Sequence, residues 1–433
     1  MNSTKFSLAG RGLKLDTTDD VQQHLQALAD SSGLEHIDLS GNTFGVAACE
    51  ALAPLLSSQH TLQSVDLHDI FTSRKEWEIP EGLQFLLNAL LQCPRLHTID
   101  LSDNAFGLQV VVPAKKANKE GEEEKMIEKA LLNFLSRHTP LKHLILNNNG
   151  MGPEAGTLIA NALAELAERK AEARKQGLDV PHLESIVCGR NRLENGSMKA
   201  WALAYEAHKS GMKSVKMTQN GIRPEGISLL LRDGLGHCSN LETLDMQDNT
   251  FTFKGAGALA DVIGGWSKLK ELGVGDDLLG ANGAIKVFEK LGTGHNKEVE
   301  LLRLQYNDIT TKGVEALLRA GKEGLPKLRR VELNGNKFNE DDAHIEAIAE
   351  MLSERKEKFG SADDPDEHWG VDELDEMEEE DSDEDEAEAE AAEEEEEREK
   401  VLREAEEAED ETVALKEDAD VDELADILKK TGV

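Results

Sequence analysis

One nine-residue pattern recurs along the 433-residue chain and restricts its fold more than any other feature. An apolar residue is followed by two variable residues, two apolar residues at alternate positions, two more variable residues and an asparagine, as in "LEHIDLSGN". We call the ninth position the asparagine slot. Eight copies carry asparagine there: Asn42, Asn104, Asn149, Asn191, Asn220, Asn249, Asn307 and Asn336. Two degenerate copies carry Ile70 and Asp277 instead.

Successive slots lie 28 to 30 residues apart in the regular stretches, which is the long end of the leucine-rich repeat period. Each copy predicts a short strand, and the slot amide is expected to bond the backbone of the turn that follows. A helix follows each strand, as in "GPEAGTLIANALAEL", whose apolar residues fall on one helical face. No single unit can bury its apolar face alone. The sequence therefore predicts an α/β solenoid, a crescent with parallel strands on its concave face and helices on its convex face.

Charge divides the chain into two predicted domains. Residues 361–433 hold 36 acidic and 6 basic side chains, a balance of −30, which leaves −8 of the total charge of −38 for the rest. We expect a repeat domain over 1–355 and an acidic, largely disordered tail over 356–433, with a possible short helix at "VDELADILKK". Charged inserts near 114–126 and 166–180 are expected to extend a convex helix or to form a solvated loop.

Composition excludes several functions. A net charge of −38 argues against nucleic-acid binding. There is no apolar run of 18 residues and no signal-peptide core, which predicts a soluble protein of the cytoplasm without a membrane partner. The four cysteines lack zinc-site spacing, and no phosphate-loop, nucleophile-elbow or metalloprotease motif occurs, so we expect no metal site and no enzyme active site. The sequence is typical of a binding scaffold.

The stretch "HLILNNNGMGPEAG" holds three consecutive asparagines. Asn149 occupies the slot, whereas Asn147 and Asn148 occupy the variable positions and can face outward at the rim. Exposed asparagines in such turns are usually only tolerated turn residues. An arginine in the loop after a degenerate copy is either plain surface charge or a clamp on a carboxylate or phosphate. The candidates for partner binding are Arg74, Lys75, Asp103, Asn147, Arg190, Arg192, Gln219, Asp248 and Tyr306.

Several motifs in this order resemble the Ran GTPase-activating protein family, in its compact fungal form. They are "DIFTSR" with "EIPEGL", "LSDNAFG", "LKHLILNNNGMGPEAG", "CGRNRLENGSMKAWA", "LRLQYNDI" and "ELNGNKF". The resemblance covers nearly all of residues 5–345. It implies a protein that converts Ran-GTP to Ran-GDP in support of nucleocytoplasmic transport. The family usually carries glycine before the loop arginine, where this chain has Ser73.

The resemblance also implies a mechanism. The activator would position the glutamine of the GTPase with a rim asparagine, which matches Asn148, and would use no arginine finger. Arg74 would bind and orient Ran. GTP and Mg²⁺ would be held by the GTPase, so the chain needs no cofactor of its own. We expect a monomer whose partners are GTP-bound Ran and Ran-binding accessory proteins.

Two other classes combine some of these features. Acidic leucine-rich histone chaperones also join repeats to an acidic tail, but their repeats are shorter than 28 to 30 residues. Ribonuclease-inhibitor-like proteins match the repeat length, but they are rich in cysteine, and this chain has only four. The chaperone, a binding protein with no GTPase-activating role, is the alternative that tests must separate.

Overall fold

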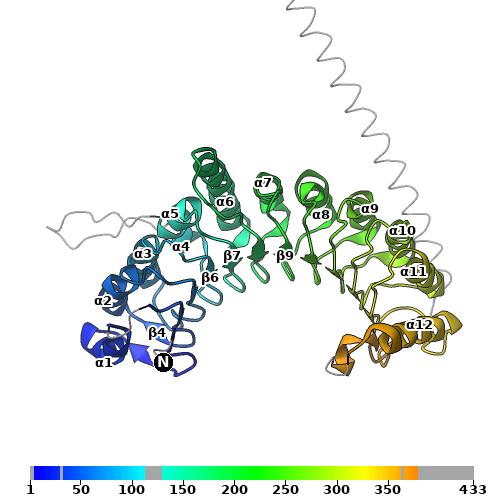
Figure 1. Ribbon diagram of the computed structural model, residues 1–433, viewed down its shortest axis with the longest axis horizontal. Helices are drawn as coiled ribbons and strands as arrows, with labels where there is room; N and C mark the ends of the chain where they lie inside the picture. The colour runs from blue at the N-terminus through cyan, green and yellow to red at the C-terminus, as the bar shows by residue number, and fades with distance from the viewer. Residues whose placement is uncertain (1–3, 30–32, 113–128, 362–364, 379–433) are drawn as a thin grey trace, which may run out of the picture. The chain divides into compact units, whose positions relative to one another are not determined.

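The computed structural model describes residues 4–29, 33–112, 129–361 and 365–378. Twelve parallel strands pair in nearly sequential order into one curved sheet, which Figure 1 shows on the inner side of a crescent with the helices outside. The strands of this sheet are β1 (Lys5–Ser7), β3 (His36–Asp38), β5 (Ser64–Asp66), β6 (Thr98–Asp100), β7 (His143–Ile145), β8 (Ser185–Val187), β9 (Ser214–Lys216), β10 (Thr243–Asp245), β11 (Glu271–Gly273), β12 (Leu301–Arg303), β13 (Arg330–Glu332) and β14 (Gly370–Val371). A second, two-stranded sheet pairs β2 (Lys14–Leu15) with β4 (Thr43–Phe44). The predicted leucine-rich repeat fold is confirmed.

The convex layer consists of the helices between successive strands, one in most repeats and two, α4 and α5, between β6 and β7. Its helices are α1 (Thr18–Ala29), α2 (Val46–Ser57), α3 (Glu78–Leu90), α4 (Leu108–Val111), α5 (Ala130–Arg137), α6 (Gly152–Lys175), α7 (Glu194–Ala207), α8 (Pro224–Leu229), α9 (Thr252–Ile263), α10 (Gly280–Gly292), α11 (Thr311–Glu323) and α12 (Ala343–Phe359). A π-helical turn (Leu230–Gly234) and a 3₁₀ turn (Leu235–His237) continue α8, and another 3₁₀ turn covers Asp366–His368. None of the helices in the described ranges is long and apolar enough to span a bilayer.

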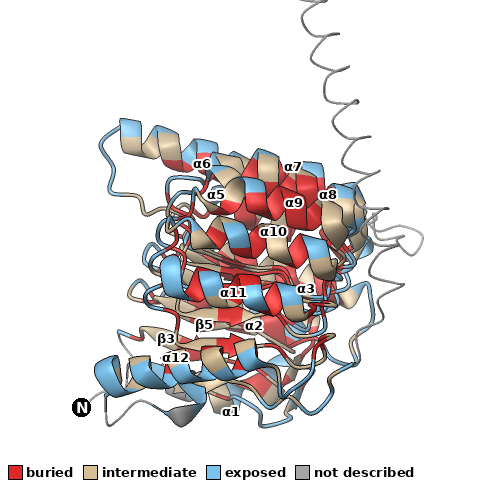
Figure 2. Ribbon diagram, turned by 90° about the vertical axis from the view of Figure 1, so that its right-hand side faces the viewer, coloured by how far each residue is buried: buried red, intermediate tan, exposed pale blue. Residues whose placement is uncertain are grey.

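The core lies between the two layers, where Figure 2 shows the buried residues gathered. The middle residue of each three-residue strand points into it, as Ile37 and Leu144 do, while its two neighbours face the concave surface. In α6, Ala155, Ile159 and Leu166 are fully buried, which confirms the predicted apolar face. This helix also runs into the predicted 166–180 insert, whereas the 114–126 insert lies outside the described residues.

The slot asparagines form a hydrogen-bonded ladder through the interior. In a typical slot, Nδ2 of Asn149 donates to the carbonyl oxygens of Leu101 and Leu146, both at 3.1 Å. Its Oδ1 accepts the backbone N–H of Asn104 at 2.9 Å, so the amide joins its own turn to that of the preceding repeat. All eight asparagines are buried. At each of these eight slots the amide bonds the backbone of its own turn and of the preceding repeat, not that of the turn that follows.

The folded unit extends further than the predicted boundary at 355. Its described residues continue to Glu378, because β14 adds a parallel strand beside β13, Arg330 donates to the carbonyl oxygens of Trp369 and Val371, both at 3.2 Å, and the backbone N–H of Glu378 donates to Asn336 O at 2.9 Å. Asp372 then accepts the backbone N–H of Leu333 at 2.6 Å. This segment covers the open edge that the last repeat would otherwise expose. The predicted terminal helix lies outside the described residues.

Candidate functional site

A row of exposed side chains runs along the rim of the crescent, one residue before each slot. We call it the rim row. Its non-glycine members all have a positive φ, between 49° and 59°. They are Asp69, Asp103, Asn148, Arg190, Gln219, Asp248, Asp276 and Tyr306. The backbone N–H of each donates to the next repeat, as Asn148 does to Gly189 O at 2.9 Å. Left-handed backbone is costly for side chains other than asparagine, aspartate and glycine. The ladder holds this conformation and aims every rim side chain outward.

The three consecutive asparagines have three different environments. Asn149 is buried in its slot. Asn147 is half-buried, and its Oδ1 accepts the N–H of Gly189 at 2.7 Å, so much of its bonding is internal. Asn148 is exposed, and its Nδ2 donates to Oδ1 of Asp103 at 2.6 Å. The structure therefore braces the outward amide of Asn148 against the neighbouring repeat.

Arg74 differs from the expectation of an exposed loop arginine, because only 7% of its side chain is accessible. Its Nε donates to Oγ1 of Thr43 at 2.7 Å, Nη2 donates to the Thr43 carbonyl at 2.8 Å, and Nη1 pairs with Asp16. The guanidinium is therefore held by its own chain, and a role of Arg74 in binding a partner stays a prediction. Arg74 joins the loop after β5 to the N-terminal repeats. Ser73 before it has a φ of 64°, a conformation that suits the glycine usual in the resembled family.

The loop that Arg74 anchors presents two other side chains to solvent. Lys75 is exposed, and its Nζ lies 5.1 Å from the ring centre of Trp77. Trp77 is itself 59% exposed. Sequence analysis selected Lys75 and missed Trp77, because a lone tryptophan carries no pattern that predicts exposure.

The remaining candidates are exposed but differ in their contacts. Gln219, Asp248 and Arg190 lie in the rim row, whereas Arg192, with a φ of 54°, follows the slot Asn191. Tyr306 is 44% exposed, yet its hydroxyl donates to Glu376, a residue of the segment that caps the last repeat. The structure thus brings Asp103 and Asn148 together and turns Tyr306 toward an acidic side chain of the same chain.

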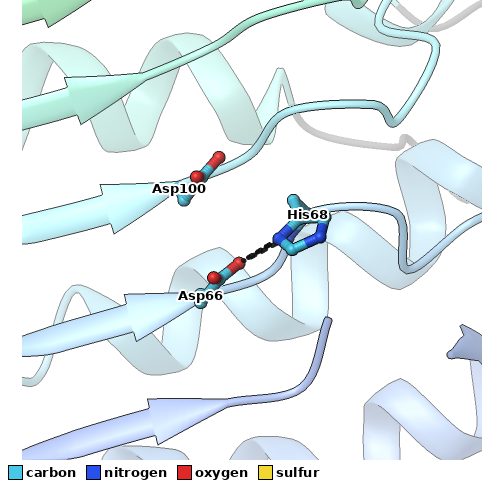
Figure 3. A group of neighbouring side chains, drawn as sticks. All are labelled: Asp66, His68 and Asp100. Carbon is cyan, nitrogen blue, oxygen red and sulfur yellow. Dashed lines mark hydrogen bonds and ion pairs between the residues drawn. The ribbon is translucent and has the colours of Figure 1, made fainter. Parts of the chain in front are cut away.

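A group that sequence analysis missed lies on the concave face beside the rim: Asp66, His68 and Asp100 (Figure 3). Nδ1 of His68 lies 2.8 Å from Oδ1 of Asp66. Burial opposes a charge on the ring, but the carboxylates of Asp66, Asp100 and Asp103 outweigh it and raise the pKa of His68. Burial also raises the pKa of Asp100. No short motif could reveal this group, because its members come from two repeats.

Known proteins match this chain over most of its length. A leucine-rich repeat family model matches residues 237–260 and 295–318. The Ran GTPase-activating protein 1 of Saccharomyces cerevisiae is 39% identical over 350 residues, which cover 79% of this chain and 81% of that protein. The Ran GTPase-activating protein of Drosophila melanogaster is 32% identical over 80% of this chain and 54% of its own length. That of Xenopus laevis is 36% identical over 50% of this chain and 34% of its own length.

Among solved structures, an internalin of Listeria monocytogenes covers 81% of this chain and 84% of its own, with 16% identity and a TM-score of 0.44. The leucine-rich repeat protein LegL7 of Legionella pneumophila covers 83% and 99%, with 14% identity and a TM-score of 0.41. The sequence relatives decide the family, since the yeast protein is similar across four-fifths of both chains. This chain is a member of the Ran GTPase-activating protein family.

Proposed function

We propose that this chain binds Ran in its GTP-bound form and accelerates the conversion of Ran-GTP to Ran-GDP, in support of nucleocytoplasmic transport. Family membership supports the activity, and the braced, outward amide of Asn148 is the observation that carries the mechanism. GTP and Mg²⁺ belong to the GTPase, so the chain contributes no cofactor. It acts as a monomer in the cytoplasm, alone or with Ran-binding accessory proteins.

Asn148 orients the glutamine of the GTPase that positions the attacking water. Because Nδ2 of Asn148 already donates to Asp103, its Oδ1 is left to accept from the glutamine amide, and its second N–H is left to donate. The positive φ and the ladder bond to Gly189 fix the backbone that carries this amide. A fixed amide removes rotational freedom from the glutamine and the water, which lowers the entropic part of the barrier.

The mechanism uses no arginine finger. The inaccessible guanidinium of Arg74 supports this, because an extended finger would have to break its bonds to Thr43 and Asp16. Arg74 acts instead as a positioning residue for the loop that carries Lys75. The exposed Arg190 and Arg192 lie one repeat beyond Asn148, and we assign them, with Lys75, Asp103, Asn147, Gln219, Asp248 and Tyr306, to partner binding.

Single-turnover GTP hydrolysis on Ran tests this proposal, with binding affinity measured in parallel. Asn148→Ala should lower the saturating rate by about 10²-fold or more while binding persists, since misplacement of a reacting group by an ångström costs about that much. The matched control is Gln219→Ala, another exposed rim amide with the same backbone, which should leave the saturating rate nearly unchanged.

A double variant, Arg190→Ala with Arg192→Ala, separates binding from catalysis. We expect it to weaken affinity and to retain the saturating rate. If the saturating rate instead collapsed as in Asn148→Ala, a rim arginine would be acting as a finger and the mechanism would be wrong. If the native chain gave no acceleration, the activating role itself would fail, and the acidic repeat protein that only binds, such as a histone chaperone, would replace it.

A further inference from the structure

Three ligand atoms of two chemical kinds meet on the concave face. An imidazole nitrogen of His68 and one carboxylate oxygen each of Asp66 and Asp100 all lie within 4.8 Å of one another. Figure 3 shows the two carboxylates on neighbouring strands, with the imidazole beside them at the end of β5. All three side chains are half-buried, so each is held by its surroundings yet reachable from solvent.

The repeat geometry itself produces this meeting. Asp66 and Asp100 are directly paired in the parallel register of β5 and β6. Directly opposite residues on one face of a sheet stand about 5 Å apart. His68 follows Asp66 by two residues, so its side chain emerges on the same face. The backbone N–H of His68 also bonds Oδ1 of Asp66 at 3.0 Å, which fixes the end of the strand.

The two carboxylates have no basic residue to balance them. Within the described ranges, Asp66 forms an ion pair with His68, and no lysine or arginine pairs with Asp66 or Asp100. Other carboxylates on this face are paired across strands: Glu184 with Lys213 at 2.9 Å, and Glu332 with Arg303 at 3.7 Å. Adjacent like charges repel each other, so this position favours a bound cation.

We propose that Asp66, His68 and Asp100 form a binding site for a divalent transition-metal ion of the Zn²⁺ class. One nitrogen and two oxygen ligands suit Zn²⁺, whereas Mg²⁺ and Ca²⁺ favour oxygen alone. Three protein ligands leave the fourth tetrahedral position for water or for a side chain of a bound protein. The site lies on the surface that the crescent presents to partners and does not depend on the proposed function.

The change that the Asp66–His68 pair needs to bind the ion is small. Two ligands of one tetrahedral Zn²⁺ stand about 3.3 Å apart when each bond is about 2.0–2.1 Å. The 2.8 Å between Nδ1 of His68 and Oδ1 of Asp66 must therefore open by about 0.5 Å. Zn²⁺ takes the place of the proton shared by these atoms, and an imidazolium loses that proton to solvent. Binding should therefore weaken as the pH falls.

Titration of the full-length chain tests the site, with Zn²⁺ followed by calorimetry and Co²⁺ followed by its visible absorption. The native chain should bind one Co²⁺ with the intense bands of a tetrahedral N/O site. His68→Gln and Asp100→Asn should each weaken this binding by at least about 10-fold and remove the bands. The matched control is His36→Gln, which removes another half-buried imidazole of the concave face that lies outside the group.

Carboxylates elsewhere in the acidic chain contribute the same background in all four proteins, so the difference between variants isolates the site. The urea midpoints of the four proteins should agree, because the substituted side chains are half-exposed. The proposal is overturned if His68→Gln binds Zn²⁺ as tightly as the native chain, or if the tetrahedral bands are absent from the native chain. The group would then hold a proton on His68 and no metal.

Discussion

Replacing Asp277 by asparagine should stabilise this protein, because a carboxyl stands there in a position built for an amide. The side chain is fully buried. Its Oδ1 accepts the backbone N–H of Asn249 at 2.8 Å, but no donor in the described part of the chain reaches Oδ2. In the next slot, Nδ2 of Asn307 donates to the carbonyl oxygens of Val274 and Leu304, at 2.6 and 3.2 Å. An amide at 277 would have the corresponding carbonyls before it.

The size of this gain in the free energy of unfolding depends on the proton that the buried Asp277 carboxyl binds. Burial raises the pKa of Asp277 well above its usual 3.8, so the folded state keeps a proton that the unfolded state releases. The difference between pH 7 and 3.8 is 3.2 pH units, which sets an upper limit of about 4 kcal/mol on the cost of keeping that proton at pH 7. New hydrogen bonds from the amide add about 1 kcal/mol each. We expect Asp277→Asn to raise the free energy of unfolding by about 2–4 kcal/mol at pH 7.

The sign of the pH dependence provides the sharper test. Because its pKa is raised, the Asp277 carboxyl contributes fully to the free energy of unfolding only below about pH 3.8. As the pH rises, this contribution falls by about 1.4 kcal/mol per pH unit while the folded carboxyl stays protonated. Asp277→Asn lacks this loss. Urea unfolding, followed by tryptophan fluorescence to which the buried Trp201 and Trp266 contribute, should show the gap between variant and native protein widening as the pH rises above about 3.8. A variant no more stable than the native chain, or a gap independent of pH, would refute the reasoning.

Three further substitutions test the other internal contacts. Lys170→Met should lower the free energy of unfolding by about 3 kcal/mol or more in urea titrations. The buried Nζ donates to three carbonyl oxygens at 2.7 to 2.8 Å, and these would lose their donor. An unchanged urea midpoint would contradict this. Arg74→Lys should speed amide hydrogen exchange around residues 10–16 and 43–45, because it weakens the bonds of this side chain to Thr43. GTPase activation should fall together with this loosening. Lost activation without faster exchange would instead indicate direct contact with the partner. Asn220→Ala should cost about 2–4 kcal/mol by thermal unfolding, because its amide makes two buried bonds to the preceding turn and one within its own. Gln219→Ala on the rim should cost under about 0.5 kcal/mol.

Sequence analysis predicted the exposed rim positions where the periodic backbone decides the geometry. An asparagine in the slot has one arrangement that satisfies its amide, so the position of Asn149 also determines that Asn148 lies one residue earlier on the rim. The same offset predicts that Gln219 and Asp248 lie in the exposed row, where the structure has them.

Sequence analysis did not predict the contacts that long side chains make with residues of other repeats. Whether Arg74 points outward depends on Asp16, which lies 58 residues away in sequence. Whether Tyr306 is free depends on Glu376, 70 residues away, in a segment that the composition assigned to a disordered tail.

The sequence by itself determined the repeat fold, the slot ladder and the outward direction of the rim, because each depends on a local pattern that recurs at a fixed period. Only the tertiary structure decided that Arg74 binds its own chain, that described residues as far as Glu378 pack on the last repeat, and that His68 lies beside two carboxylates. The physical reason is that a repeat pattern fixes the direction in which each side chain leaves the backbone. What that side chain meets there depends on stacking against residues of another repeat.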